Sequence, residues 1–269
     1  MSTLIGNFQN VISIGYVCDT KAFITNTQQS FVRGDYVFDR MGSPMWAVSE
    51  LVANNFQNFL TNIGSKVLFD NSEKSYVLDT TYYLRLMLSS PQSINRNKLI
   101  ASTTIAKNRF MAAINGNQSI LFIRSEEPTS YSDIGSRISL PEYADKYANT
   151  ELSYVNAFSD TVKNINPNLQ FKILYLGRTL TAPFNDETHN VVGIPIGDAI
   201  DYRDPFAGKK IVNAVSAQST FLQTHLVLTP AQPVQSINQP AQLQPITGDV
   251  GTQILQETHG DEVANQVTV

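Results

Sequence analysis

The chain has 269 residues, of which 42% are hydrophobic, and its 19 basic and 23 acidic residues give a formal charge of −4. This length and apolar content suffice for one sizeable core, and the sequence shows no basic patch of the kind that nucleic-acid binding needs, so we expect no nucleic-acid partner. The single cysteine, Cys18, excludes an internal disulfide and a cysteine-based zinc site. Three scattered histidines indicate no metal centre, so we expect no cofactor.

The first ten residues lack the basic stretch and the apolar region of a signal peptide. No apolar run approaches the roughly 18 to 20 residues that span a bilayer. We therefore expect a soluble protein without membrane contact, located in a cytoplasm or, if the source is viral, associated with a virion.

The predicted elements begin with a short β-branched strand, NVISIGY, which Gly15 closes. A helix from about Cys18 to Thr27 follows it. The stretch DYVFD is a second short extended piece, and it leads directly into the next predicted helix.

The strongest helix pattern is GSPMWAVSELVANNFQNFL, which places its apolar side chains on one face. Ser43 is its predicted N-cap, and Pro44 suits the first helical position. The segments KVLF and SYVLDTTYYLRLML, which come next, have strand-like content, with a helix at the end of the second as the alternative.

The middle of the chain predicts a helix over NKLIASTTIAKNRFMAAING, ending at Gly116, and then a buried strand, SILFIR. A long helix from Pro141 to about Asn164 leads to a second buried strand, FKILYLG, and HNVVGIPIG adds another strand. Two buried strands joined by one helix form a parallel βαβ unit. Residues 1–228 therefore predict a three-layer α/β fold, in which helices flank a mostly parallel mixed sheet.

The composition changes from about Thr229, and we treat residues 229–269 as a Pro/Gln-rich C-terminal arm, either extended or disordered. This segment has four prolines in its first half, four acidic residues, no basic residue and no aromatic residue. Such a composition cannot bury much apolar surface by itself. The alternative to a disordered tail is an arm that becomes ordered on a protein partner or a neighbouring subunit, by strand addition.

Polar residues follow the predicted strands at the edge where parallel strands end, and ligands of α/β proteins bind at that edge. They are Cys18, Asp39, Arg40, Arg124 and Arg178. The arginines indicate a small anionic ligand such as a carboxylate or a phosphate. The alternative for each arginine is a salt bridge that closes the end of a strand.

Cys18 is the candidate nucleophile, because a helix N-terminus favours the thiolate. A thiol enzyme also needs a base within hydrogen-bond reach, and His189 is the best candidate by context, at the start of HNVVGIPIG. The alternatives are that Cys18 is a buried small apolar residue and that His189 is a loop residue.

The motifs VISIGYVC, YVFDRMGSP, NNFQNFL and RFMAAINGNQSILFIR together resemble the DUF1796 family of papain-like cysteine peptidases, from bacteria and large DNA viruses. The resemblance covers residues 11 to about 124 and continues weakly to FKILYL. It implies a thiol hydrolase, an activity that is itself a prediction for the family, with Cys18 as the site cysteine and Asp39 in a Phe-Asp motif. It also implies a papain-like α+β fold, in conflict with the α/β expectation. The family's His-Asp pair is incomplete here, because Asp79 is present without a neighbouring histidine.

Three functions are compatible with these features, and whether the chain is an enzyme stays open among them. The first is a catalytically degenerate member that serves as a binding or structural component, such as a virion protein. The second is an active thiol hydrolase that uses Cys18 and His189. The third is an α/β domain that binds an anionic ligand through Arg124 and Arg178. The incomplete His-Asp pair and the arm favour the first function slightly over the second.

Overall fold

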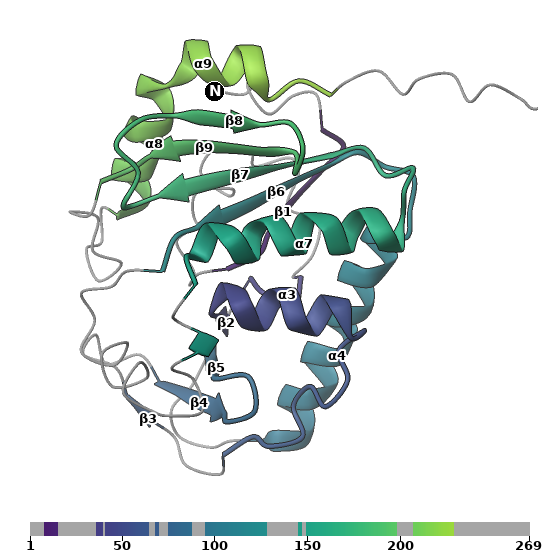
Figure 1. Ribbon diagram of the computed structural model, residues 1–269. Coiled ribbons are helices and arrows are strands. Elements are labelled where there is room, and N and C mark those ends of the chain that lie inside the picture. Colours follow the sequence, from purple (N-terminus) through teal and green to yellow (C-terminus); the bar gives the residue numbers. More distant parts are fainter. Residues whose placement is uncertain are drawn as a thin grey trace, which may run out of the picture. The chain divides into compact units, whose positions relative to one another are not determined.

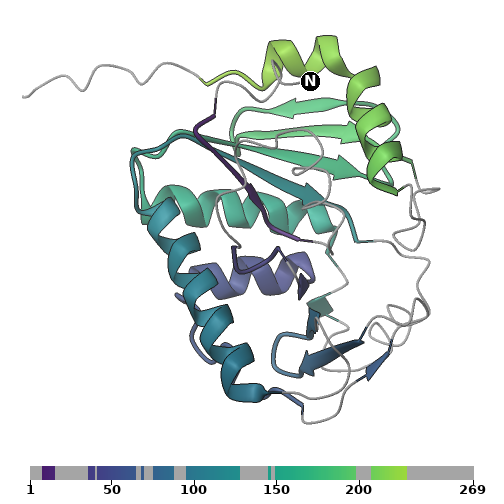
Figure 2. The ribbon, with the colours of Figure 1, turned by 180° about the vertical axis from the view of Figure 1, so that it is seen from behind.

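The computed structural model describes residues 8–15, 36–39, 41–64, 68–69, 75–87, 95–127, 145–146, 149–197 and 207–228. Within these ranges a five-stranded, mostly parallel sheet lies between helices (Figures 1 and 2). The predicted α/β class is therefore confirmed over the papain-like α+β alternative. Cys18, Arg40 and the arm 229–269 lie outside the described residues.

The five-stranded sheet has the strand order β1-β6-β7-β9-β8. Four strands are parallel to one another, and they are β1 (Asn10–Ser13), β6 (Ile120–Ser125), β7 (Phe171–Gly177) and β9 (Val191–Pro195). The fifth, β8 (Phe184–Asp186), pairs antiparallel with β9 and was not predicted. Because the parallel strands start and end together, we call the side where they end the carboxyl edge and the side where they start the amino edge.

The helix between β6 and β7 is α7 (Glu151–Ile165), and it completes the predicted βαβ unit. Its apolar residues Val155, Phe158 and Val162 are buried, as the sequence indicated. The expected start at Pro141 is wrong, because Thr150 has extended backbone and is the N-cap. Its hydroxyl accepts a hydrogen bond from the Ser153 N–H at 3.4 Å, which satisfies one of the free donors at the helix start.

The two faces of the sheet pack against different helices, which confirms the three-layer arrangement. Successive strand residues point to opposite faces, so Phe122 and Ile173 join one cluster while Leu121 and Leu174 join the other. The first cluster is completed by helices α3 (Met45–Ala53), α4 (Arg96–Ile114) and α7, and the second by α8 (Ala207–Ala217) and α9 (Ser219–His225). The sequence analysis did not predict α8 and α9.

A small antiparallel sheet with the order β2-β5-β4-β3 lies beyond α3, on the side away from α7 (Figure 1). Its strands are β2 (Met41–Gly42), β3 (Leu68–Phe69), β4 (Ser75–Asp79) and β5 (Leu84–Met87). The expected strand content of this region is confirmed, and Leu84–Met87 is a strand rather than a helix. The extended piece expected at DYVFD is wrong, since Val37–Asp39 form a turn closed by a hydrogen bond from the Asp39 N–H to the Tyr36 carbonyl oxygen at 3.1 Å.

Helix α3 is shorter at both ends than its sequence pattern suggests. It starts at Met45 after Pro44 as the N-cap, and no side chain caps it, so the predicted capping role of Ser43 is wrong. It ends at Ala53, seven residues before the end of the apolar pattern.

The chain after α3 is held in a left-handed conformation by the β4–β5 hairpin. The non-glycine residues with positive φ in this segment are Asn55, Phe56, Asn58 and Leu60. The Leu60 N–H donates to the Asp79 carboxylate at 3.0 Å, and the Tyr82 hydroxyl donates to the Gln57 carbonyl oxygen at 2.9 Å. These contacts offset the steric cost of left-handed backbone, which is roughly 1–2 kcal/mol per residue.

No helix in the described ranges is both long enough and apolar enough to cross a membrane.

Candidate functional site

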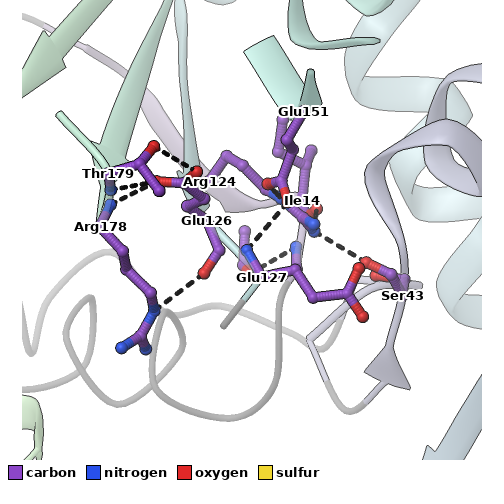
Figure 3. Close-up of polar contacts among 10 residues, drawn as sticks. Ile14, Ser43, Arg124, Glu126, Glu127, Glu151, Arg178 and Thr179 are labelled. Atoms are coloured by element: carbon purple, nitrogen blue, oxygen red, sulfur yellow. Dashed lines mark hydrogen bonds and ion pairs between the residues drawn. The ribbon is translucent and has the colours of Figure 1, made fainter. Parts of the chain in front are cut away.

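Arg124 lies near the end of β6 and is fully buried at the carboxyl edge. Its Nε donates to the Glu151 Oε1 at 2.7 Å, and its Nη1 donates to the carbonyl oxygens of Ile14 at 3.1 Å and Ser43 at 2.9 Å (Figure 3). Burial alone would lower the pKa of Arg124, but Glu151 and Glu127 raise it above its usual value. The guanidinium therefore stays charged and connects β1, the segment before α3 and the first residue of α7.

Glu151, the first residue of α7, is the carboxylate partner of Arg124. Its Oε2 accepts a hydrogen bond from the Glu127 N–H at 2.9 Å, so one carboxylate holds both the Arg124 side chain in β6 and the backbone that follows β6. A carboxylate at this position also benefits from the helix dipole. Burial raises the pKa of Glu151. The charge of Glu127 raises this pKa further, whereas the charge of Arg124 lowers it.

Arg178 directly follows β7 and reaches the same edge through Glu126. The Glu126 carboxylate accepts hydrogen bonds from the Arg178 N–H, from the Thr179 N–H at 2.9 Å and from the Thr179 hydroxyl at 2.7 Å. The Arg178 Nε in turn donates to the Glu126 carbonyl oxygen at 3.0 Å. Figure 3 shows the Arg178 side chain extending away from Arg124, so the two arginines share an edge without pointing at one common spot.

Asp39 is buried and holds the turn that leads toward β2. Its Oδ2 accepts a hydrogen bond from the Tyr36 N–H at 2.8 Å. The pKa of Tyr36 is raised by burial and by the Asp39 charge, while Arg109 acts in the opposite direction. Asp39 thus closes a turn and does not end a strand as expected.

Gly15 is the last described residue before Cys18, and three of the sequence motifs meet at it. Its φ is +80°, and an added Cβ would lie 2.3 Å from the Ser43 Oγ and 2.7 Å from the Arg124 Nη1. Only glycine fits this position. The motifs VISIGYVC, YVFDRMGSP and SILFIR therefore converge at the carboxyl edge. Ser43 was not expected there, because its position before an apolar helical pattern is typical of a helix cap.

His189 lies at the amino edge, in the turn between β8 and β9. The next residue, Asn190, accepts a hydrogen bond from the Ile173 N–H near the start of β7, at 2.8 Å. The His189 Nδ1 is 2.7 Å from the Asp186 Oδ2, and its Nε2 is 3.7 Å from the Asp160 Oδ2. His189 thus lies at a strand start, as the sequence indicated, and at the edge opposite to Arg124 and Arg178. Burial acts to raise the pKa of Asp186, but hydrogen bonds from His189 lower it below its usual value.

Asp79, which the family resemblance places in a His-Asp pair, has a structural role in the described chain. Its side chain is fully buried, and its carboxylate accepts backbone N–H groups from Leu60 at 3.0 Å and Thr81 at 2.9 Å. A carboxylate with this many donors is used to fix the β4–β5 turn and the preceding left-handed segment.

Among the described residues no group of His, Cys, Asp and Glu side chains could hold a metal ion. Comparison of the chain with family models, curated proteins and solved structures gives no match. The resemblance to the DUF1796 family therefore stays an expectation from the sequence. The described residues form an α/β domain with a buried ionic network at the carboxyl edge of its sheet.

Proposed function

We propose that this chain is a non-catalytic α/β domain that acts as a binding or structural component, for example in a virion. The observation that carries this proposal is the position of His189 at the amino edge. Gly15 lies at the other edge, and Cys18 follows it by three residues, a length of chain that spans at most about 11 Å. A thiol without a base in hydrogen-bond reach retains little catalytic power, since the members of such a unit act together.

The contacts of the carboxyl edge support the same function. Arg124, Glu126 and Glu151 direct most of their hydrogen bonds to the backbone or to one another, as scaffold residues do. A protein partner or neighbouring subunit bound through the arm 229–269, and a cytoplasmic or virion location, belong to this proposal.

The pH dependence of Cys18 alkylation tests the proposal. We expect the rate of reaction with iodoacetamide, followed by intact mass, to rise with a single ordinary thiol pKa of about 8.5. The same profile is expected for the His189→Asn variant, because the proposal gives the imidazole no part in ionising the thiol. Alkylation of the protein in urea gives the reference profile for an unperturbed cysteine.

The active thiol hydrolase is the alternative, and the same experiment identifies it. A reaction rate that already reaches its plateau below about pH 7, and that loses this plateau in His189→Asn, would show an activated thiolate paired with the histidine. That outcome would overturn the non-catalytic proposal.

Binding of an anionic ligand through Arg124 and Arg178 is a second candidate. This function is favoured by the position of both arginines at the carboxyl edge, at the ends of neighbouring strands. Against it, the Nε of each arginine and the Nη1 of Arg124 already donate to protein oxygens.

A further inference from the structure

We propose that Gly15, Ser43 and Arg124 form a site for a neutral oxygen acceptor, such as the carbonyl oxygen of an amide ligand. In the described chain, the Ser43 Oγ and the Arg124 Nη2 are buried and have no hydrogen-bond partner. Both residues have no exposed surface. Unpaired buried polar atoms are costly, so two of them at one place point to a ligand atom that pairs with both.

The backbone at Gly15 brings these two groups together. The Ser43 Oγ and the Arg124 Nη1 both lie within 2.7 Å of the position that a Gly15 Cβ would occupy. Nη1 is held by the carbonyl oxygens of Ile14 and Ser43, which fixes the plane of the guanidinium and hence the place of Nη2. Both unpaired groups can donate a hydrogen bond, and a carbonyl oxygen has two lone pairs to accept them.

The charge of the carboxyl edge favours a neutral ligand over an anion. This edge carries three glutamates but only two arginines among these residues, which are Glu126, Glu127, Glu151, Arg124 and Arg178. Burial raises the pKa of Tyr175 far above its usual value, and Glu151 and Glu126 add to this effect. The local potential therefore disfavours a further negative charge, whereas an amide oxygen adds none.

This inference rests on the proposed binding function but is independent of the state of Cys18. The alkylation profile tests catalysis at the thiol, and ligand titration at Ser43 tests the oxygen site. Failure of one therefore leaves the other intact.

Titration of the full chain with N-methylacetamide and with acetate tests the site. We expect the backbone amide resonances of Gly15 and Ser43 to shift with N-methylacetamide and to stay in place with acetate. Ser43→Ala removes one of the two donors and should weaken binding of the amide about fivefold to tenfold. Ser119→Ala is the matched control, because that buried hydroxyl accepts the Gln9 N–H at 3.0 Å elsewhere in the sheet.

The two variants also differ without any ligand. Ser43→Ala should leave the melting temperature unchanged or raise it, since the lost hydroxyl has no partner, whereas Ser119→Ala should lower it. Equal binding of acetate would overturn the preference for a neutral acceptor. Absence of binding, together with a single ordered water at the Ser43 hydroxyl in a high-resolution crystal structure, would show a structural water site and overturn the proposal.

Discussion

The two edges of the parallel sheet both carry ion pairs, but they place them in different surroundings. At the carboxyl edge the Arg124 side chain is 0% exposed and that of Glu151 is 13% exposed. At the amino edge the side chains of His189, Asp186 and Asp160 are 26%, 29% and 56% exposed. The strength of a charge interaction depends on its surroundings. We therefore expect the ion pair of the carboxyl edge to affect stability strongly and that of the amino edge to affect it weakly.

The partners of these ion pairs differ as well. Arg124 and Glu151 also bind backbone groups of three separate segments, so losing either side chain exposes several unpaired groups at once. At the amino edge, the Asp186 contacts in the described chain lie within its own turn. His189 contacts α7 through Asp160 at 3.7 Å and through its carbonyl oxygen, which accepts a hydrogen bond from the Ser159 hydroxyl. Because its ion pair is buried and also binds the backbone, we expect the carboxyl edge to contribute more to the stability of the fold than the amino edge.

Removing the buried carboxylate should have the largest effect. We expect Glu151→Ala to lower the free energy of unfolding by about 3–5 kcal/mol, because Arg124 would then be a buried charge without its partner. Urea denaturation followed by circular dichroism measures the loss. Asp160→Ala at the amino edge is the control, with an expected change below about 1 kcal/mol. Similar losses in both variants would contradict the difference between the edges.

A smaller loss is expected from Glu126, whose carboxylate binds the backbone after β7. Glu126→Ala removes acceptors for the Arg178 N–H, the Thr179 N–H and the Thr179 hydroxyl, and should cost about 2–3 kcal/mol. Amide hydrogen exchange at residues 178 and 179 should become faster. Thr179→Val removes only the hydroxyl contact and should cost about 1 kcal/mol. If both variants lose the same stability, the backbone contacts of Glu126 contribute nothing.

The layers of the fold follow from local patterns in the sequence. SILFIR contains the continuous apolar run ILFI, and FKILYLG is apolar except for Lys172; such segments are typical of strands buried on both faces of a parallel sheet. The end of α3 could not be predicted in this way. Its apolar pattern continues past Ala53, but Asp79 and Tyr82 bind the next residues in a left-handed conformation. A local pattern does not contain these contacts, which join residues 19 and 25 positions apart.

The candidate site was only partly predictable. Arg124 and Arg178 lie at the expected edge because Arg124 is near the end of β6 and Arg178 directly follows β7. The same rule places His189 at the amino edge, since it precedes β9, and the sequence had indicated that it lies at a strand start. Glu126 and Glu151 carried no such signal, because their roles depend on which loops meet beyond the strands.

The smallest effect should appear at the amino edge, in the dependence of stability on pH. The folded protein lowers the pKa of Asp186 through its hydrogen bonds with His189. The unfolded value is about 3.9, so this stabilisation is complete above that pH and is lost as the pH falls through the lower folded value. We expect the difference in unfolding free energy between the protein and Asp186→Asn to be below about 1 kcal/mol at pH 6 and to shrink toward pH 2. Comparing the same pair in a His189→Asn background isolates the contact, because the carboxylate then lacks its imidazole partner and the difference should vary less with pH. A difference that stays constant from pH 6 to pH 2, or that grows as the solution is acidified, would show that His189 does not stabilise the charged carboxylate.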